Sequence, residues 1–254
     1  MKHLIIGLGE VGKALLEILS TEFEVETIDS YKKEVPKGRF AYIHVCIPYK
    51  DESFIETVQE YVLQYGSADV VTIVHSSVPV GTTSKLIDAV HSPIRGVHPH
   101  LVEGIRTFKK FIGGEKAEEV ALLFKKCGIE TVVTYKPENT EALKLWDTTY
   151  YYWNIHLMRA VYNYCEKYGL DFNLVYTDAN KFYNDGFTEL GRLDVVRPVL
   201  KYMPGETGGH CLVPNARLLG DEPIALFLLN EEKQLAHRKK NDNDDKGVSN
   251  QNVF

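Results

Sequence analysis

One of the four cysteines of this chain has the surroundings of a reactive thiol. Cys211 follows Gly208, Gly209 and His210, and the sequence after it has the pattern of a helix that accepts Pro214 only in its first turn. A thiol at a helix N-terminus beside a histidine has a lowered pKa, which favours a nucleophilic thiolate. We therefore predict Cys211 as a nucleophile, with the Gly-Gly-His run binding substrate. The alternative is a small buried apolar residue, which is our interpretation of Cys46, Cys127 and Cys165.

A lysine in a predicted helix is the second candidate for chemistry. Lys144 is flanked by apolar and aromatic residues rather than by the charges of a solvated face, and Thr148 lies one turn further on the same side. An amine in such surroundings is easily desolvated and can accept a proton from a substrate hydroxyl. The alternative is that the side chain extends to water, as most helical lysines do.

Two histidines follow a predicted strand, in the run Gly96-Val97-His98-Pro99-His100. They are expected at the ligand-binding edge of a sheet, where either could polarise a substrate. A His-Pro pair after such a strand also resembles the prephenate dehydrogenase group, whose histidine assists oxidation of a cyclic alcohol. No third ligand accompanies the pair, so we predict no metal site.

The first strand runs into a glycine turn that is typical of dinucleotide binding. Gly7, Gly9 and Gly12 form a Gly-x-Gly-x-x-Gly pattern between an apolar run and a helical pattern, and a second strand ends at Asp29. The glycines bring a helix N-terminus to a pyrophosphate, and the carboxylate binds a ribose. We predict NAD, because Asp29 repels a 2′-phosphate; Lys32 and Lys33 keep NADP as the less favoured alternative. The predicted cofactor site comprises Gly7, Leu8, Gly9, Glu10, Val11, Gly12, Asp29 and Ser76.

Alternating strands and helices position these residues. Strands are predicted at 2–6, 23–28, 40–47, 70–75, 94–97, 110–112 and 130–135, with helices after the glycine turn and at 53–64, 83–90 and 117–127. From 139 the period becomes helical to about 168, and further helices are predicted at 174–187 and 224–235. The expected fold is α/β, a Rossmann-type doubly wound, mostly parallel sheet followed by a smaller all-helical domain. The expected domains are 1–137 (NAD-binding), 138–237 (helical, for substrate binding and dimerisation) and 238–254, a polar flexible tail.

Composition narrows the class of protein. The 254 residues are 44% hydrophobic and carry a net charge of -6, which argues against nucleic acid or a membrane surface as partner. The cysteines lack paired spacing, and neither a signal peptide nor an apolar membrane span is recognised, so a cytoplasmic location is expected.

Four motifs in order resemble the UDP-glucose/GDP-mannose dehydrogenase family, especially its UDP-N-acetylmannosamine dehydrogenase-like branch. They are the glycine turn, the Ser-Ser-Val-Pro-Val-Gly-Thr-Thr segment at 76–83, the Glu-Ala-Leu-Lys run at 141–144 and the Gly-Gly-His-Cys run at 208–211. The resemblance implies NAD-dependent oxidation of a nucleotide-sugar alcohol to a carboxylate in two steps, through a thiohemiacetal and a thioester on Cys211. It also implies that Lys144 stabilises the alkoxide or transfers its proton, that Ser77 orders a catalytic water, and that Glu103 acts in the acid/base network.

Three departures from the family pattern affect the expected activity. Thr148 replaces an asparagine, and Asn215 replaces an aspartate four residues after the cysteine. The chain also stops before the third, nucleotide-sugar-binding domain of family members, so the resemblance supports fold and cofactor more firmly than substrate.

Three functions therefore remain open. The first is an NAD-dependent oxidoreductase acting on a sugar-type alcohol, with a nucleotide sugar as the favoured substrate and Cys211 as nucleophile. The second is a single-step hydroxy-acid dehydrogenase of the 6-phosphogluconate dehydrogenase-like superfamily, in which Lys144 alone handles the proton. The third is an NAD-binding relative without turnover. The aromatic stripe of the long helix predicts a homodimer.

Overall fold

The chain forms two compact units, Met1–Leu145 and Trp146–Phe254. The structure is a computed structural model that describes residues 2–29, 35–96, 99–205, 207 and 211–248, with the backbone alone described from 236 onwards. His98, Gly208, Gly209, His210, Lys32 and Lys33, which the sequence brings into the predicted site, lie outside the described residues.

A seven-stranded sheet forms the centre of the first unit, in the order β2-β1-β3-β4-β5-β6-β7. Every neighbouring pair is parallel except β5 and β6, which are antiparallel. The chain moves to opposite sides of β1 to form β2 and β3, so a topological switch point lies at the carboxyl ends of β1 and β3. This confirms the predicted Rossmann-type fold. The strands are β1 (Lys2–Ile6), β2 (Glu24–Ile28), β3 (Phe40–Val45), β4 (Gly66–Val74), β5 (Ala89–His91), β6 (Lys110–Gly113) and β7 (Thr131–Thr134).

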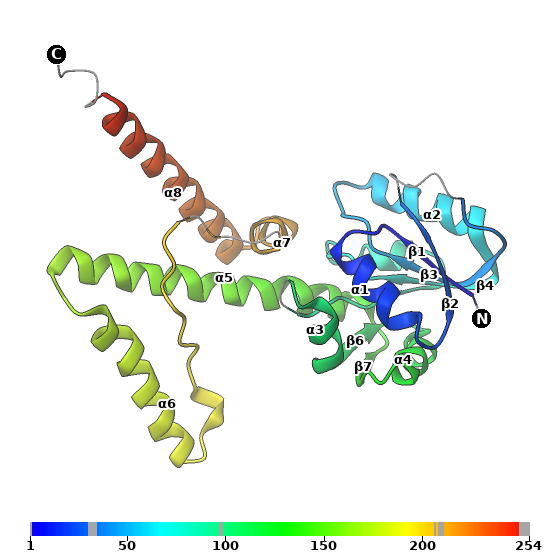
Figure 1. The fold of residues 1–254 in the computed structure, drawn as a ribbon, viewed down its shortest axis with the longest axis horizontal. Coiled ribbons are helices and arrows are strands. Elements are labelled where there is room, and N and C mark those ends of the chain that lie inside the picture. Colours follow the sequence, from blue (N-terminus) through cyan, green and yellow to red (C-terminus); the bar gives the residue numbers. More distant parts are fainter. Residues whose placement is uncertain (1, 30–34, 97–98, 206, 208–210, 249–254) are drawn as a thin grey trace. The chain divides into compact units, whose positions relative to one another are not determined.

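Helices cover both faces of the sheet, because alternate strand residues are apolar on each face (Figure 1). One core contains Leu15 of α1 (Glu10–Leu19), Leu101 of α3 (Leu101–Thr107) and Phe124 of α4 (Ala117–Lys126). The other contains Phe54 and Val58 of α2 (Ser53–Tyr65). Each such buried side chain contributes roughly 1.5–3 kcal/mol, so the sheet is a rigid support for the loops at its edge.

The segment from 83 to 97 differs from the prediction. The predicted helix at 83–90 is only a 3₁₀ turn, η1 (Thr83–Lys85), followed by β5, and the strand predicted at 94–97 is absent from its described part, 94–96. The predicted strand instead lies earlier, because residues 89–91 find partners in β4 and β6. Pro93 has no backbone N–H to donate, so the chain leaves the ladder there. The short helix α3 was not predicted.

The second unit is helical, as predicted. The long helix α5 (Pro137–Tyr168) begins in the first unit, and Tyr152 packs with Leu212, Ala225 and Leu228 in the core of the second. The backbone of α8 is helical to Val248, through the polar segment that the sequence predicts as a tail; mixed charges without proline are compatible with a helix. The remaining elements are the π-helical turn η2 (Asn173–Asp178), α6 (Ala179–Glu189), the 3₁₀ turn η3 (Leu193–Val195), α7 (Leu212–Leu218) and α8 (Pro223–Val248).

Within the described residues, no helix is both long and apolar enough to cross a membrane.

Candidate active site

The turn between β1 and α1 requires glycine at two positions. Gly7 has φ +90°, a left-handed conformation that other residues rarely adopt. A Cβ on Gly12 would lie 1.9 Å from the carbonyl oxygen of Gly7, so only glycine lets α1 start this close to β1. The local geometry therefore brings the first turn of the helix against the end of the strand.

Gly9, by contrast, faces open space. A Cβ built there meets no atom within 4 Å, and Gly9 precedes the first residue of α1 without a side-chain cap. Gly9 thus stands where α1 begins, and the N-terminus of a helix is a favourable place for an anion. The space beside Gly9 and the crowding at Gly12 fit the two different roles that a diphosphate cradle needs.

Asp29 is tied to this turn from the end of β2. Its carboxylate accepts a hydrogen bond of 2.6 Å from the backbone N–H of Leu8. The bond holds the carboxylate beside the glycine turn, at the position where an adenosine ribose would follow a bound diphosphate. The predicted residues from Gly7 to Gly12 and Asp29 are therefore brought together.

The 76–83 loop follows β4, which is the neighbour of β3 in the sheet, and hydrogen bonds to α5 fix this loop. Gly81 and Thr83 donate their backbone N–H groups to the carboxylate of Glu141, at 2.6 and 2.8 Å. Glu141 is fully buried, and burial raises its pKa against the opposing effect of these hydrogen bonds. Ser76 donates to the carbonyl of Ile47 at 2.5 Å, and its neighbour Ser77 is half-buried in the same loop.

Lys144 lies one turn after Glu141 on α5. Its Nζ donates to the carbonyl oxygen of Ile94 at 2.9 Å, in the segment that follows β5. The amine is therefore half-buried and directed to a loop beyond the sheet rather than extended into water. The side chain thus makes a contact within the protein, and its role in proton transfer stays a prediction.

A row of buried histidines was not predicted. His3 and His44 are linked at 3.0 Å, His44 and His75 at 3.0 Å, and His75 Nδ1 lies 2.6 Å from the carbonyl of Ser92. A carbonyl only accepts, so His75 carries its hydrogen on Nδ1, and neutral His44 and His3 must then also carry theirs on Nδ1. Lys110 donates to the same Ser92 carbonyl at 3.0 Å.

Burial keeps this row uncharged. Desolvation lowers the pKa of His3 to about 4 and that of Lys110 to about 7, and it holds the pKa values of His44 and His75 well below the usual range. The sequence did carry a signal: each histidine interrupts or ends an apolar strand, and His3 alternates with Ile5 on the buried face.

His100 and Glu103 meet each other at the start of α3. His100 precedes the helix, and its Nδ1 lies 3.6 Å from the Glu103 carboxylate. The two side chains are 69% and 79% exposed, so the pair is a solvated one. Their predicted roles in substrate binding and acid/base chemistry therefore stay predictions.

Cys211 directly precedes α7, which begins at Leu212 with Pro214 in its first turn, as predicted. The thiol is free and half-buried, whereas Cys127 and Cys165 are buried, as predicted. Cys46 was predicted as buried but is half-buried, and desolvation raises its pKa to about 12. Cys211 is thus the more accessible thiol in its unit.

The two residues that depart from the family pattern contact each other. Asn215, on α7, is 4% exposed and donates from Nδ2 to the Thr148 hydroxyl on α5 at 3.2 Å. A neutral amide–hydroxyl pair thus occupies the positions of an aspartate and an asparagine. This contact fixes α7, and the thiol before it, on α5 without a charge.

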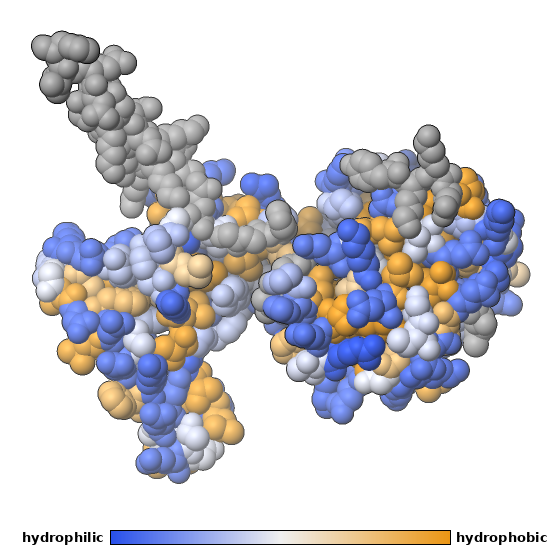
Figure 2. Space-filling view, in the orientation of Figure 1, coloured by the Kyte–Doolittle hydropathy of each residue, from blue (hydrophilic) through white to orange (hydrophobic). Residues whose placement is uncertain are grey.

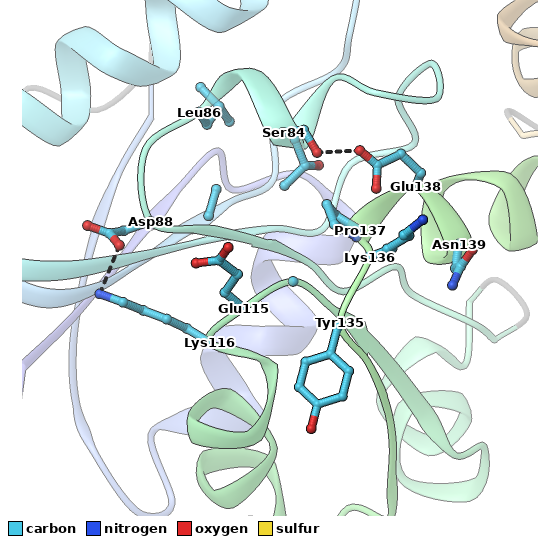
Figure 3. Close-up of a pocket in the computed structure, with 13 residues that line it drawn as sticks. Ser84, Leu86, Asp88, Glu115, Lys116, Tyr135, Lys136, Pro137, Glu138 and Asn139 are labelled. Carbon is cyan, nitrogen blue, oxygen red and sulfur yellow. Dashed lines mark hydrogen bonds and ion pairs between the residues drawn. The ribbon is translucent and has the colours of Figure 1, made fainter.

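A separate cavity of about 740 Å³ opens beside β5 in the first unit (Figure 3). Of the predicted site residues that the structure describes, none lines it. Three of its charged side chains contact other lining residues: Lys116 lies 3.2 Å from Asp88, and Ser84 donates to Glu138. Among the described residues, no three His, Cys, Asp or Glu side chains are placed to hold a metal ion.

The fold and these loops define a Rossmann-type α/β unit followed by a helical unit. No protein-family model matches this sequence, and no curated protein matches it. Among solved structures, it is similar to a UDP-D-ManNAc dehydrogenase from Pyrococcus horikoshii, with a TM-score of 0.72, 17% identity, and coverage of 92% of this chain and 69% of the other.

Two further structures are similar over most of this chain. An NDP-N-acetyl-D-galactosaminuronic acid dehydrogenase from Methanosarcina mazei Go1 has a TM-score of 0.67 at 16% identity, over 94% of this chain and 67% of the other. A 3-hydroxyisobutyrate dehydrogenase from Mycobacterium tuberculosis has a TM-score of 0.66 at 14% identity, over 93% and 94%. At sequence identities of 14% to 17%, the structural similarity establishes the fold alone.

Proposed function

We propose that this protein is an NAD-dependent oxidoreductase acting on a sugar-type alcohol, with a nucleotide sugar as the favoured substrate class. The observation that carries the proposal is the β1–α1 turn, where Gly12 is crowded, Gly9 is open and Asp29 is held beside Leu8. This combination is what a dinucleotide diphosphate and ribose require. Two of the three similar structures quoted above are described as nucleotide-sugar dehydrogenases, which supports the substrate class.

The residues from Gly7 to Gly12 would hold the diphosphate, Asp29 the ribose, and Ser76 the nicotinamide half. When bound, NAD supplies an acceptor for the hydride that leaves the alcohol carbon. The carboxylate of Asp29 favours NAD over NADP, because a 2′-phosphate would meet a negative charge.

Lys144 and Cys211 would perform the remaining chemistry. The Lys144 amine takes the hydroxyl proton of the substrate or stabilises the alkoxide as the carbonyl forms. The Cys211 thiolate then adds to the aldehyde carbon, which gives a thiohemiacetal and opens a route beyond the aldehyde. Oxidation of this thiohemiacetal to a thioester would use a second NAD as hydride acceptor. Ser77 and Glu103 would then order and activate the water that hydrolyses the thioester to the acid and the free thiol, while Thr148 and Asn215 support the site around the thiol.

A single-step hydroxy-acid dehydrogenase is the second candidate, and two observations favour it. A 3-hydroxyisobutyrate dehydrogenase is among the similar structures, with a TM-score of 0.66. The neutral Asn215–Thr148 pair also removes a carboxylate from beside the cysteine. In this function Lys144 handles the proton and Cys211 takes no part.

We further propose that the protein is a homodimer through its helical unit. Hydrophobic side chains lie on the surface of this unit (Figure 2); they include Leu157, Leu174, Phe182 and Leu190, which are 50%, 64%, 73% and 74% exposed. Contiguous exposed apolar surface is typical of interfaces. Light scattering after size exclusion should give twice the chain mass; a monomer at micromolar concentration would contradict the dimer.

The stoichiometry of NADH distinguishes these functions. Wild type and Cys211→Ser are assayed with UDP- and GDP-sugars and with 2- and 3-hydroxy acids. Two NADH per substrate, abolished by Cys211→Ser, support the four-electron oxidation. One NADH that survives the substitution supports the single-step reaction. NADH binding without turnover of any substrate identifies the inactive relative.

A further inference from the structure

A cluster of polar side chains in the helical unit holds the chain just before Cys211. The Glu232 carboxylate, on α8, accepts from the Thr207 backbone N–H at 3.0 Å and from the Thr207 hydroxyl at 2.7 Å. The Tyr152 hydroxyl, on α5, donates to the same carboxylate at 3.1 Å, and His156 Nε2 lies 3.4 Å from it. One carboxylate therefore joins α5, α8 and residue 207.

Arg159 completes the attachment of Thr207. Its Nη1 donates to the Thr207 hydroxyl at 2.7 Å, while that hydroxyl donates its own hydrogen to Glu232. Both the donor and an acceptor site of the hydroxyl are thus used, and the backbone N–H is used as well. A valine at this position would keep the shape of the side chain and lose both hydroxyl bonds.

The cluster is largely removed from water. Tyr152 is fully buried, His156 is 9% exposed, and the Glu232 side chain is 17% exposed. Burial alone would raise the pKa of Glu232, but the hydrogen bonds from Thr207 and Tyr152 and the nearby His156 outweigh it and lower that pKa. The carboxylate is therefore ionised at neutral pH, and charge-assisted bonds of this kind are the stronger ones.

The other side of Cys211 is fixed on the same two helices. Leu212, the first residue of α7, packs in one core with Tyr152 of α5 and with Ala225 and Leu228 of α8. Tyr152 contributes to both attachments, with its ring in the core and its hydroxyl on Glu232. Thr207 precedes Cys211 by four residues, so the chain is held on α5 and α8 before and after the thiol.

We propose that Glu232 is a positioning residue for Cys211, acting through Thr207 to fix the chain four residues before the thiol. The inference rests on the proposed function in one respect, that Cys211 is the nucleophile of the reaction. Neither Glu232 nor Thr207 would touch the substrate. Their part is to reduce the range of positions that the thiol samples, which is the component of catalysis most sensitive to small displacements.

A matched set of variants tests this proposal without requiring turnover. The rate of iodoacetamide alkylation at Cys211 is measured by mass spectrometry, and hydrogen exchange is measured in the peptide that spans 205–212. Thr207→Val and Glu232→Leu should each speed both rates by at least about threefold, because residue 207 is detached from α8 more often. Thr207→Ser keeps the hydroxyl and should have the wild-type rates. Glu231→Gln removes one negative charge, as Glu232→Leu does, and should also have the wild-type rates.

Activity provides the second measurement. If wild type forms NADH, Thr207→Val should lower kcat by at least about tenfold while the KM for NAD stays within twofold. If wild type forms no NADH, the proposed function fails, and the alkylation result still decides whether Glu232 and Thr207 position Cys211. The positioning role would be overturned if both Thr207→Val and Glu232→Leu showed the wild-type rates of Cys211 alkylation and of hydrogen exchange.

Tyr152→Phe is a control for misfolding of the other variants. It removes one donor to Glu232 and keeps the ring in the core, so the helical signal in circular dichroism should be unchanged. Alkylation of Cys211 should still accelerate, by less than in Thr207→Val. An unchanged rate in this folded variant would likewise count against the proposal.

Discussion

Gly12 and Gly9 differ in what a side chain would meet, and the difference is measurable. A Cβ at Gly12 would lie 1.9 Å from the Gly7 carbonyl, whereas one at Gly9 would meet nothing within 4 Å. We expect Gly12→Ala to lower the free energy of unfolding by at least about 2 kcal/mol, because strand and helix must separate. Gly9→Ala should stay within about 0.5 kcal/mol of wild type. Urea denaturation checks both; equal losses would show that the turn is not packed as described.

Other residues of the site could be predicted only in part. The glycine turn and Asp29 follow from spacing, because a tight turn at the end of a strand demands specific residues. The contact between Thr148 and Asn215 could not be predicted, since it joins residues 67 positions apart on different helices. The bonds of Thr207 to Glu232 likewise depend on how α5 and α8 pack, which no local pattern encodes.

At the scale of elements, Glu141 joins the start of α5 to the loop after β4. Its buried carboxylate accepts the N–H groups of Gly81 and Thr83. Glutamine would place an amide donor against one of these donors, so Glu141→Gln should lower the free energy of unfolding by about 2–4 kcal/mol. Glu138→Gln, a half-buried change in the same helical turn, should have little effect, because the amide oxygen can still accept the hydrogen bond from Ser84. Equal urea midpoints for the two variants would contradict this attachment.

The strands and helices could be predicted where each forms from its own sequence pattern. Phe40–Val45 is an example for a strand, because it is a clear apolar run, and Ala117–Lys126 is an example for a helix, because its apolar residues have a clear helical period. The segment at 83–91 could not, because β5 has only three residues and forms by pairing with β4 and β6. Asp88, with φ +48°, turns the chain into that strand, and such a turn has no clear signal.

At the scale of the whole molecule, the buried histidines predict sensitivity to acid. Desolvation lowers the pKa of His3 to about 4 and that of His91 to about 3, with His44 and His75 also well below 6.5. Below pH 6.5 the unfolded chain binds protons that the folded chain does not. The free energy of unfolding should therefore be greatest above pH 6.5 and fall as pH decreases toward 4, by up to about 1.4 kcal/mol per pH unit for each histidine.

Removing one histidine should reduce this slope. In His3→Gln the loss of stability between pH 6.5 and 4.5 should be smaller by up to about 1.4 kcal/mol per pH unit, whatever the variant's stability at pH 7.5. Urea titrations at four pH values measure the slope. The same slope in wild type and variant would mean that His3 is accessible to protons in the folded state.

The central claim is that the β1–α1 turn binds a nicotinamide dinucleotide, and titration with NADH followed by fluorescence tests it most directly. Wild type should bind NADH, and Gly9→Ala should weaken binding by at least about tenfold at unchanged stability, because its methyl group enters the space that the diphosphate needs. Absence of NADH binding to folded wild type, or equal binding by both proteins, would contradict the account.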